Sequence, residues 1–124
     1  MKRIAFIDLG SNSVRFVIYE ISKTGSYRLI YQEKESVRLS ENMWGTHELT
    51  EEAMERSLRA LKGFVHMADA MEVDTIKAVA TAAVRLSKNG DAFIKSVKER
   101  TGLDLECIAG EEEARLGFLG VINT

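Results

Sequence analysis

The sequence predicts an α/β domain with a five-stranded mixed sheet, in which three antiparallel strands are followed by two parallel ones. Three observations indicate this fold: apolar and β-branched runs come first, a helical repeat begins near Leu49, and strand-like segments then alternate with helical ones. The 124 residues are enough for one hydrophobic core and too few for two ordinary domains, so residues 1–124 are expected to form a single domain.

The first three strands are predicted to follow one another in antiparallel order. KRIAFIDL (2–9) contains four consecutive apolar residues, which is typical of a central strand covered on both faces. SVRFVIYEI (13–21) and YRLIYQEKESVRL (27–39) are separated by SKTGS (22–26), whose glycine and hydroxyl residues suit a hairpin connection.

The second part of the chain alternates between helical and strand-like patterns. A helix begins near Leu49 with Thr50 as its N-cap, and its apolar residues recur at spacings of four and three: Met54, Leu58, Leu61, Val65 and Ala68.

The remaining elements are predicted from turn and cap residues. DTIKAVAT (74–81) and LDLECIA (103–109) are strand-like, and NGDAFIKSVKERTG (89–102) is a helix between an asparagine cap and a glycine stop. GEEEARLGFLGVI (110–122) opens a further helix. Helical crossovers join the parallel strands, so this order of elements predicts a ribonuclease H-like arrangement with flanking helices.

The overall charge excludes some classes of partner. The net charge of -2 provides no general attraction for nucleic acid or for an anionic membrane, so an anionic ligand must be held by local groups. The N-terminus resembles neither a signal peptide nor a membrane span, and the expected location is cytoplasmic. The single cysteine, Cys107, cannot form an internal disulfide and is predicted to be a small core residue.

The stretch IDLGSNS (7–13) places polar residues between two predicted strands. The residues concerned are Asp8, Gly10, Ser11, Asn12 and Ser13. A sharp turn there would expose backbone N–H groups as an anion-binding nest. An ordinary hairpin tip uses the same residue types, so both interpretations stay open. Asp8 repels phosphate, so it would act through Mg²⁺ or an ordered water. A lone acid is a poor metal site, and His47 and His66 are better interpreted as isolated surface histidines.

Two further segments follow predicted parallel strands, where open α/β sheets usually bind ligands. Taken alone, the three glutamates of GEEEAR (110–115) are well explained by the helix dipole, but a glutamate at this edge could activate water as a general base. Thr81 ends the strand at 74–81, and Arg85 lies just beyond it. Arg15 and Arg38 are further phosphate-binding candidates, although a surface role suits each arginine as well.

Three motifs in this order carry a family resemblance: IDLGSNSVRFVIYE (7–20), ATAAVRLSKNGDAF (80–93) and IAGEEEARLGFLGV (108–121). Together they resemble the N-terminal domain of the exopolyphosphatase and guanosine pentaphosphate phosphohydrolase (Ppx/GppA) family, in the actin-like ATPase superfamily. The likeness spans essentially the whole chain.

The resemblance implies a role for particular positions. The first phosphate-binding loop would be Gly10, Ser11, Asn12 and Ser13. Asp8 would be a magnesium-associated acid, and Arg15 and Arg85 would lie near the phosphate chain. Glu113 would be the catalytic base that deprotonates the attacking water, with Glu112 as second choice because three consecutive glutamates allow a one-residue shift in the alignment.

The resemblance also implies a missing partner. Family members usually continue into a second lobe that begins with a DIGGGSTE-like loop, and these 124 residues contain no such segment. The chain is therefore expected to form one wall of an active site, with the other supplied by a C-terminal lobe. A homodimer of a longer form is compatible with the resemblance, and the oligomeric state stays open.

The implied activity is that of an exopolyphosphatase, which releases terminal orthophosphate from polyphosphate by metal-assisted attack of water. The same motifs serve guanosine pentaphosphate as substrate. Two other classes stay open: a kinase of the same superfamily, which would need an acceptor-positioning acid, and a non-catalytic module that binds phosphate or an alarmone.

Overall fold

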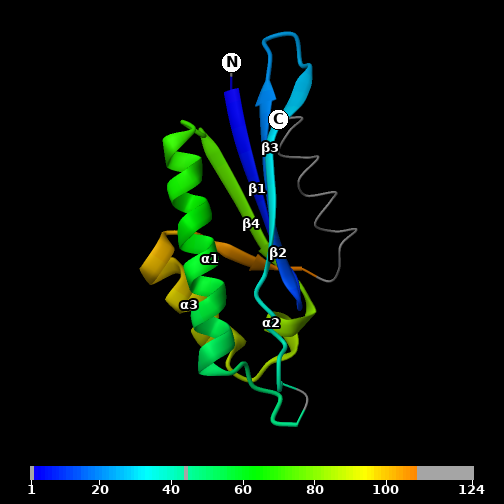
Figure 1. Cartoon of the computed structure of the whole chain (residues 1–124), viewed down its shortest axis with the longest axis vertical. Helices are drawn as coiled ribbons and strands as arrows, with labels where there is room; N and C mark the ends of the chain where they lie inside the picture. The colour runs from blue at the N-terminus through cyan, green and yellow to red at the C-terminus, as the bar shows by residue number, and fades with distance from the viewer. Residues whose placement is uncertain (1, 44, 109–124) are drawn as a thin grey trace.

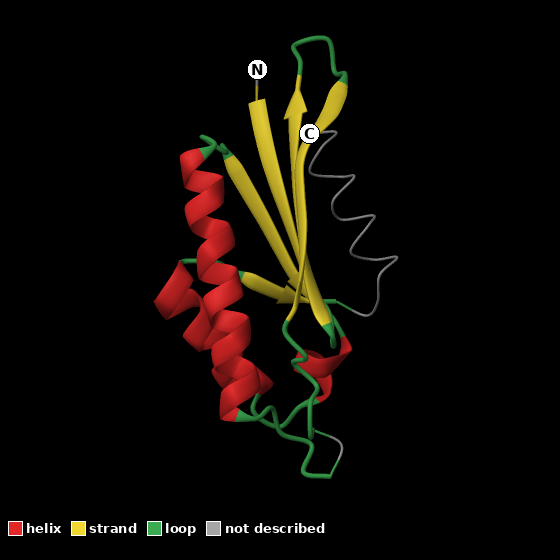
Figure 2. Cartoon of the chain, viewed as in Figure 1, coloured by secondary structure: helices red, strands yellow, loops and turns green. Residues whose placement is uncertain are grey.

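The computed structural model describes residues 2–43 and 45–108. Their sheet has the order β3-β2-β1-β4-β5, with antiparallel pairing among the first three strands and parallel pairing of β4 with β1 and β5 (Figures 1 and 2). The strands are β1 (Lys2–Leu9), β2 (Ser13–Ile21), β3 (Tyr27–Ser36), β4 (Thr75–Ala80) and β5 (Leu105–Cys107). The helices are α1 (Glu51–Ala70), α2 (Ala82–Leu86) and α3 (Gly90–Thr101). The predicted mixed sheet is confirmed.

Several predicted boundaries differ from the observed ones, and one helix was missed; β4 and β5 are each shorter than the predicted 74–81 and 103–109. β3 ends at Ser36, and the predicted last residues of that strand, Val37 and Leu39, are instead buried in the loop that follows. The short helix α2 was not predicted; it begins directly after β4 and Thr81. The helix predicted at 110–122 lies outside the described residues.

The two faces of the sheet have different surroundings. In Figure 1, α1 and α3 lie on the same side of the sheet. Alternate residues of the central strands face these helices and form the main core, among them Ile7, Leu9, Val14 and Phe16. On the opposite face, Ile4 and Phe6 form a smaller cluster with Val17 and Val79. Since side chains alternate along a strand, Asp8 continues the face of Ile4 and Phe6.

Helix α1 is fixed at its start and along its length. Thr50 caps it as predicted, because its Oγ1 accepts a hydrogen bond from the Ala53 N–H at 3.1 Å. Phe64 stacks on Phe16 of β2 with ring centroids 4.8 Å apart. No helix within the described residues combines the length and apolarity that a membrane crossing requires.

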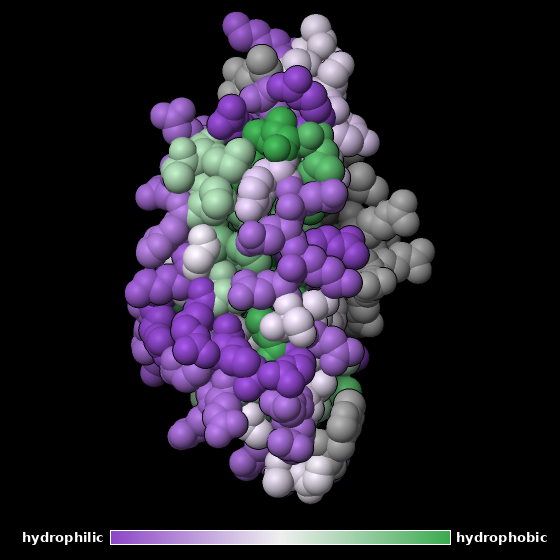
Figure 3. Space-filling model, in the orientation of Figure 1, coloured by the Kyte–Doolittle hydropathy of each residue, from purple (hydrophilic) through white to green (hydrophobic). Residues whose placement is uncertain are grey.

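The outer surface is mixed in character. Figure 3 shows hydrophilic side chains over the lower part of α1 and apolar surface in the upper half of the view. The exposed apolar side chains on β3 and α1 include Leu29 and Met67. β3 is an edge strand, and its sequence Glu33-Lys34-Glu35 places charges that discourage pairing with another chain.

Helix α3 ends as predicted and begins differently. Gly102 ends the helix in the left-handed conformation at φ +82°. Asn89 occupies the N-cap position, but its side chain makes no capping bond. It pairs instead with the Leu49 backbone: Oδ1 accepts from the Leu49 N–H at 2.8 Å, and Nδ2 donates to the Leu49 carbonyl at 2.9 Å. Asn89 thereby joins the start of α3 to the segment before α1.

Gly90 is required by close packing between α2 and α3. A Cβ atom at this position would lie 2.1 Å from the Val84 carbonyl oxygen, whereas a Cβ atom at Gly63 in α1 meets nothing within 4 Å. We expect Gly90→Ala to lower the free energy of unfolding by about 3 kcal/mol, because the backbone must move. Gly63→Ala should raise it by about 0.5–1 kcal/mol. Urea unfolding followed by circular dichroism measures both, and equal midpoints for the two variants would contradict the expected clash.

Candidate functional site

The turn between β1 and β2 is held by backbone hydrogen bonds. The Gly10 N–H donates to the Ser13 carbonyl at 2.9 Å, and a Cβ atom on Gly10 would lie 3.3 Å from that same oxygen. The Asn12 carbonyl accepts from the N–H groups of Val37 and Arg38, at 3.0 and 2.8 Å. Glycine at position 10 therefore permits a tight turn, which is supported from outside by the segment after β3.

This turn forms part of a cavity of about 240 Å³ at the carboxyl ends of β1 and β4. In Figure 1 these ends lie at the lower part of the sheet, beside α2. The lining residues come from β1, the turn, β2, β3 and the residue after β4: Asp8, Gly10, Ser11, Asn12, Ser13, Arg15, Lys34 and Thr81. The cavity thus combines hydroxyl, amide, carboxylate and cationic groups.

The charged groups of the cavity form a row across three strands. Asp8 of β1 is the cross-strand partner of Arg15 in β2, which is in turn the partner of Lys34 in β3. Directly opposite residues of antiparallel strands share a face, so the row lies on one side of the sheet. With two cations and one carboxylate, the row suits an anion with several negatively charged oxygens.

Thr81 closes the opposite side of the cavity. Its N–H donates to the Leu9 carbonyl at 3.1 Å, and its Oγ1 lies 3.5 Å from the same oxygen. The threonine therefore stays next to the end of β1, where its hydroxyl is one of the cavity's lining groups.

Asp8 is the residue predicted to associate with a metal ion. Its Oδ1 atom is fully buried and its side chain lines the cavity. No group of three or more His, Cys, Asp or Glu side chains suited to a metal occurs in the described part of the chain. Mg²⁺ is often bound by one or two carboxylates together with substrate phosphates and water. A single carboxylate such as Asp8 is compatible with that mode, and its association with Mg²⁺ stays a prediction.

The comparison with family models decides the family of the chain. The model described as the Ppx/GppA phosphatase family matches residues 17–124. The chain belongs to the Ppx/GppA phosphatase family. This confirms the family inferred from the three sequence motifs.

Individual relatives agree with the Ppx/GppA assignment. The chain is 39% identical over 126 residues to a bifunctional 3-dehydroquinate synthase/phosphatase of Fusobacterium nucleatum, with 97% of this chain and 19% of that protein covered. It superposes on the Ppx/GppA family member of Aquifex aeolicus with a TM-score of 0.88 and 37% identity, over 97% of this chain and 39% of the other. An exopolyphosphatase of Cytophaga hutchinsonii gives a TM-score of 0.86 and 35% identity, with 97% and 38% covered.

These comparisons also show how much of its relatives' length the chain covers and which fold it shares with more distant proteins. The chain spans less than two fifths of the length of each of these three relatives. A more distant structure, RuvC of T. thermophilus, superposes with a TM-score of 0.51 at 11% identity and shares the fold alone. The predicted ribonuclease H-like architecture is thereby confirmed.

The Ppx/GppA residues predicted from sequence fall into three groups. Asp8, Arg15 and the four residues of the loop 10–13 line one cavity. Arg85 lies exposed on α2 and is not among the lining residues, and its role stays a prediction. Glu112 and Glu113 lie outside the described residues, so their expected approach to the turn stays a prediction as well.

Lys34 is the cavity residue that the sequence reasoning did not identify. It belongs to a strand that was predicted, and it becomes part of the site because of its register opposite Arg15. If the register of β3 against β2 had been known, the alternation of side chains along β3 would have placed Lys34 on the same face of the sheet as Arg15. Arg38, a predicted phosphate candidate, pairs instead with Glu41 at 3.6 Å and is not among the residues that line the cavity.

Cys107 lies at the end of β5 and packs partly against the main core. Burial raises the pKa of its thiol, and Asp91 raises it further, whereas Arg85 acts in the opposite direction. A raised pKa lowers the thiolate fraction at neutral pH, so this cysteine is poorly suited to act as a nucleophile.

The cation row predicts a specific pattern of anion affinity. Arg15→Gln should weaken binding of inorganic tripolyphosphate by roughly tenfold, because a charge-assisted hydrogen bond is lost from the cavity. Lys23→Gln is the matched control, since Lys23 is an exposed cation in the β2–β3 connection, at the other end of β2. Isothermal titration calorimetry measures both affinities, and an equal loss in the two variants would contradict a local role for Arg15.

Proposed function

We propose that this chain provides the phosphate-binding wall of an exopolyphosphatase. The observation that supports this most directly is the single cavity that joins the turn 10–13 to Asp8, Arg15 and Lys34 in a member of the Ppx/GppA phosphatase family. The family membership limits the chemistry to phosphate transfer or phosphate recognition, and the row of charges has the chemical character that a phosphate chain requires.

Each group would have a distinct part in binding. Backbone N–H groups and hydroxyls of the turn would donate to the terminal phosphate, and Arg15 and Lys34 would neutralise the phosphates that follow. Asp8 would hold Mg²⁺ together with phosphate oxygens. When bound, this ion would reduce the negative charge that an attacking water must approach.

The hydrolytic step would need a base beyond the described residues. Glu113 would take a proton from water as its oxygen attacks the terminal phosphorus in line, and the bond to the bridging oxygen would break. Orthophosphate leaves, and the shortened chain retains the bridging oxygen. Glu112 is the alternative base.

Inorganic polyphosphate is the substrate that we favour. The cations at Arg15 and Lys34 continue across the sheet toward its β3 edge, which suits a repeating anion. The similarity to the Cytophaga hutchinsonii exopolyphosphatase points the same way. Guanosine pentaphosphate also ends in a phosphate chain and is the alternative substrate. A cytoplasmic location is part of the same proposal.

Phosphate release measured with malachite green distinguishes the two candidate substrates. In the full-length protein that carries this chain, release from polyphosphate should exceed release from guanosine pentaphosphate at equal terminal-phosphate concentration. The reverse order would replace polyphosphate by the guanosine nucleotide. ATP-dependent phosphorylation of an acceptor without phosphate release would instead favour the kinase alternative.

The 124-residue chain by itself is expected to bind tripolyphosphate and hydrolyse it slowly. Catalysis of this type requires groups that act on the transferred phosphoryl from both sides, and the matched relatives are much longer than this chain. We expect turnover to be at least about 100-fold below that of the Aquifex aeolicus family member, because the loss of positioned groups has an effect on the order of that size. Equal rates would contradict the assignment of this chain to one wall.

Glu113→Gln in the full-length protein should reduce turnover by roughly 100-fold or more while leaving polyphosphate affinity unchanged, because a general base contributes to the reaction and not to binding. Glu111→Gln is the matched control within the same run of glutamates. Retained turnover in Glu113→Gln together with loss in the Glu112→Gln variant would assign the base to Glu112.

A further inference from the structure

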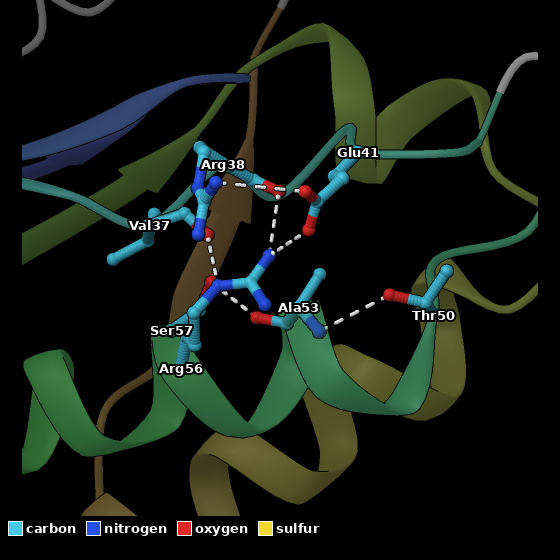
Figure 4. A network of polar contacts seen from close by, with 7 residues as sticks. All are labelled: Val37, Arg38, Glu41, Thr50, Ala53, Arg56 and Ser57. Carbon is cyan, nitrogen blue, oxygen red and sulfur yellow. Dashed lines mark hydrogen bonds and ion pairs between the residues drawn. The ribbon is translucent and has the colours of Figure 1, made fainter.

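Arg56 of α1 lies outside the cavity, but a short series of contacts links it to the phosphate loop. Its Nε atom donates to the Val37 carbonyl at 3.0 Å, and its Nη2 atom donates to the Arg38 carbonyl at 3.3 Å and to Glu41 Oε2 at 2.6 Å (Figure 4). The side chain is only 22% exposed. One guanidinium therefore holds two backbone carbonyls and a carboxylate of the same loop.

The segment held by Arg56 is the one that supports the phosphate loop. Val37 and Arg38 donate their N–H groups to the Asn12 carbonyl, and Ser40 donates to the Ser11 carbonyl at 3.0 Å. Arg38 has a φ angle of +48°, a left-handed conformation that is unfavourable for a residue with a Cβ atom. The hydrogen bonds from Arg56 stabilise this conformation by fixing the carbonyls of the two peptide units that flank the Cα atom of Arg38.

Peptide geometry transmits this support to the cavity. The described peptide bonds are all trans, and in a trans peptide unit the carbonyl and the N–H point in opposite directions. The carbonyl of Ser11 shares a unit with the N–H of Asn12, and the carbonyl of Asn12 shares one with the N–H of Ser13. Fixing both carbonyls against the segment 37–40 thus directs the two N–H groups away from it.

We propose that Arg56 is a positioning residue for phosphate binding, which acts through the segment 37–40 to orient the N–H groups of Asn12 and Ser13. Glu41 completes the arrangement, because its carboxylate lies between Arg56 and Arg38 at 2.6 and 3.6 Å. Arg56 itself touches no residue of the loop 10–13 in any hydrogen bond among the described residues. The phosphate part of this inference rests on the proposed function.

The role of Arg56 is tested by two measurements on the 124-residue chain. The first is amide hydrogen exchange without ligand at Val37, Arg38 and Ser40, whose N–H groups donate to the loop carbonyls, and the second is titration with inorganic tripolyphosphate. In Arg56→Ala, these three amides should exchange faster, and tripolyphosphate should bind on the order of tenfold more weakly. Arg59→Ala is the matched control, because it removes an exposed arginine one turn along the same helix. It should change neither quantity.

A second variant separates positioning from a general effect on stability. Arg56→Lys keeps the positive charge beside Glu41, but an ammonium group lacks the planar set of donors that reaches three acceptors. Its urea midpoint should stay close to that of the unchanged chain, while tripolyphosphate affinity and amide protection remain reduced. If Arg56→Ala fails to fold, Arg56→Lys and Glu41→Gln provide the same comparison.

The outcomes distinguish the inference from the function on which it rests. Unchanged exchange at Val37, Arg38 and Ser40 in Arg56→Lys, or a rise in exchange spread evenly over α1 and the sheet, overturns the positioning role. Faster exchange confined to these three amides supports it. If the unchanged chain binds no tripolyphosphate, the phosphate-binding proposal is overturned, whereas faster exchange confined to Val37, Arg38 and Ser40 would still support the orientation of the loop by Arg56.

Discussion

The antiparallel pairing of β1 with β2 is the constraint on which the candidate site depends. Its register places Arg15 opposite Asp8, and pairing with β3 places Lys34 opposite Arg15. The same pairing forces the chain between Leu9 and Ser13 into a tight turn at the end of the sheet. Parallel pairing with β4 then brings Thr81 to that end. The polar groups lie close together because the hydrogen-bond ladders of the three strand pairs fix the position of each of them.

The helices cover one face of the sheet and form the main core with it, whereas the charged residues of the cavity lie on the other face. The buried side chains of β1 and β2 that face α1 form a continuous core, and the stacking of Phe16 on Phe64 belongs to it. The smaller cluster on the opposite face ends near Asp8. A carboxylate can be accommodated next to that cluster because it lies at the strand end, where hydroxyls, amides and cations replace apolar neighbours.

The support of the turn passes through backbone groups over three segments. The carbonyls of the turn accept hydrogen bonds from the loop after β3, and the carbonyls of that loop accept hydrogen bonds from α1. Asn89 makes a comparable link between α3 and the residues before α1. In this Ppx/GppA family member, irregular segments are thus held in place by polar contacts with regular ones, which is how a loop can present groups at fixed positions.

The sequence by itself determined the features that depend on neighbours along the chain. The strands at 2–9 and 13–21, the Thr50 cap and the Gly102 stop follow from local pattern and local backbone geometry, and the three motifs determined the family. Only the tertiary structure decided that Lys34 lines the cavity, that Asn89 binds the Leu49 backbone instead of capping α3, and that Arg56 holds the segment after β3. Those contacts join residues 15 or more positions apart or depend on strand register, and nothing in the local sequence specifies which distant partner a side chain will meet.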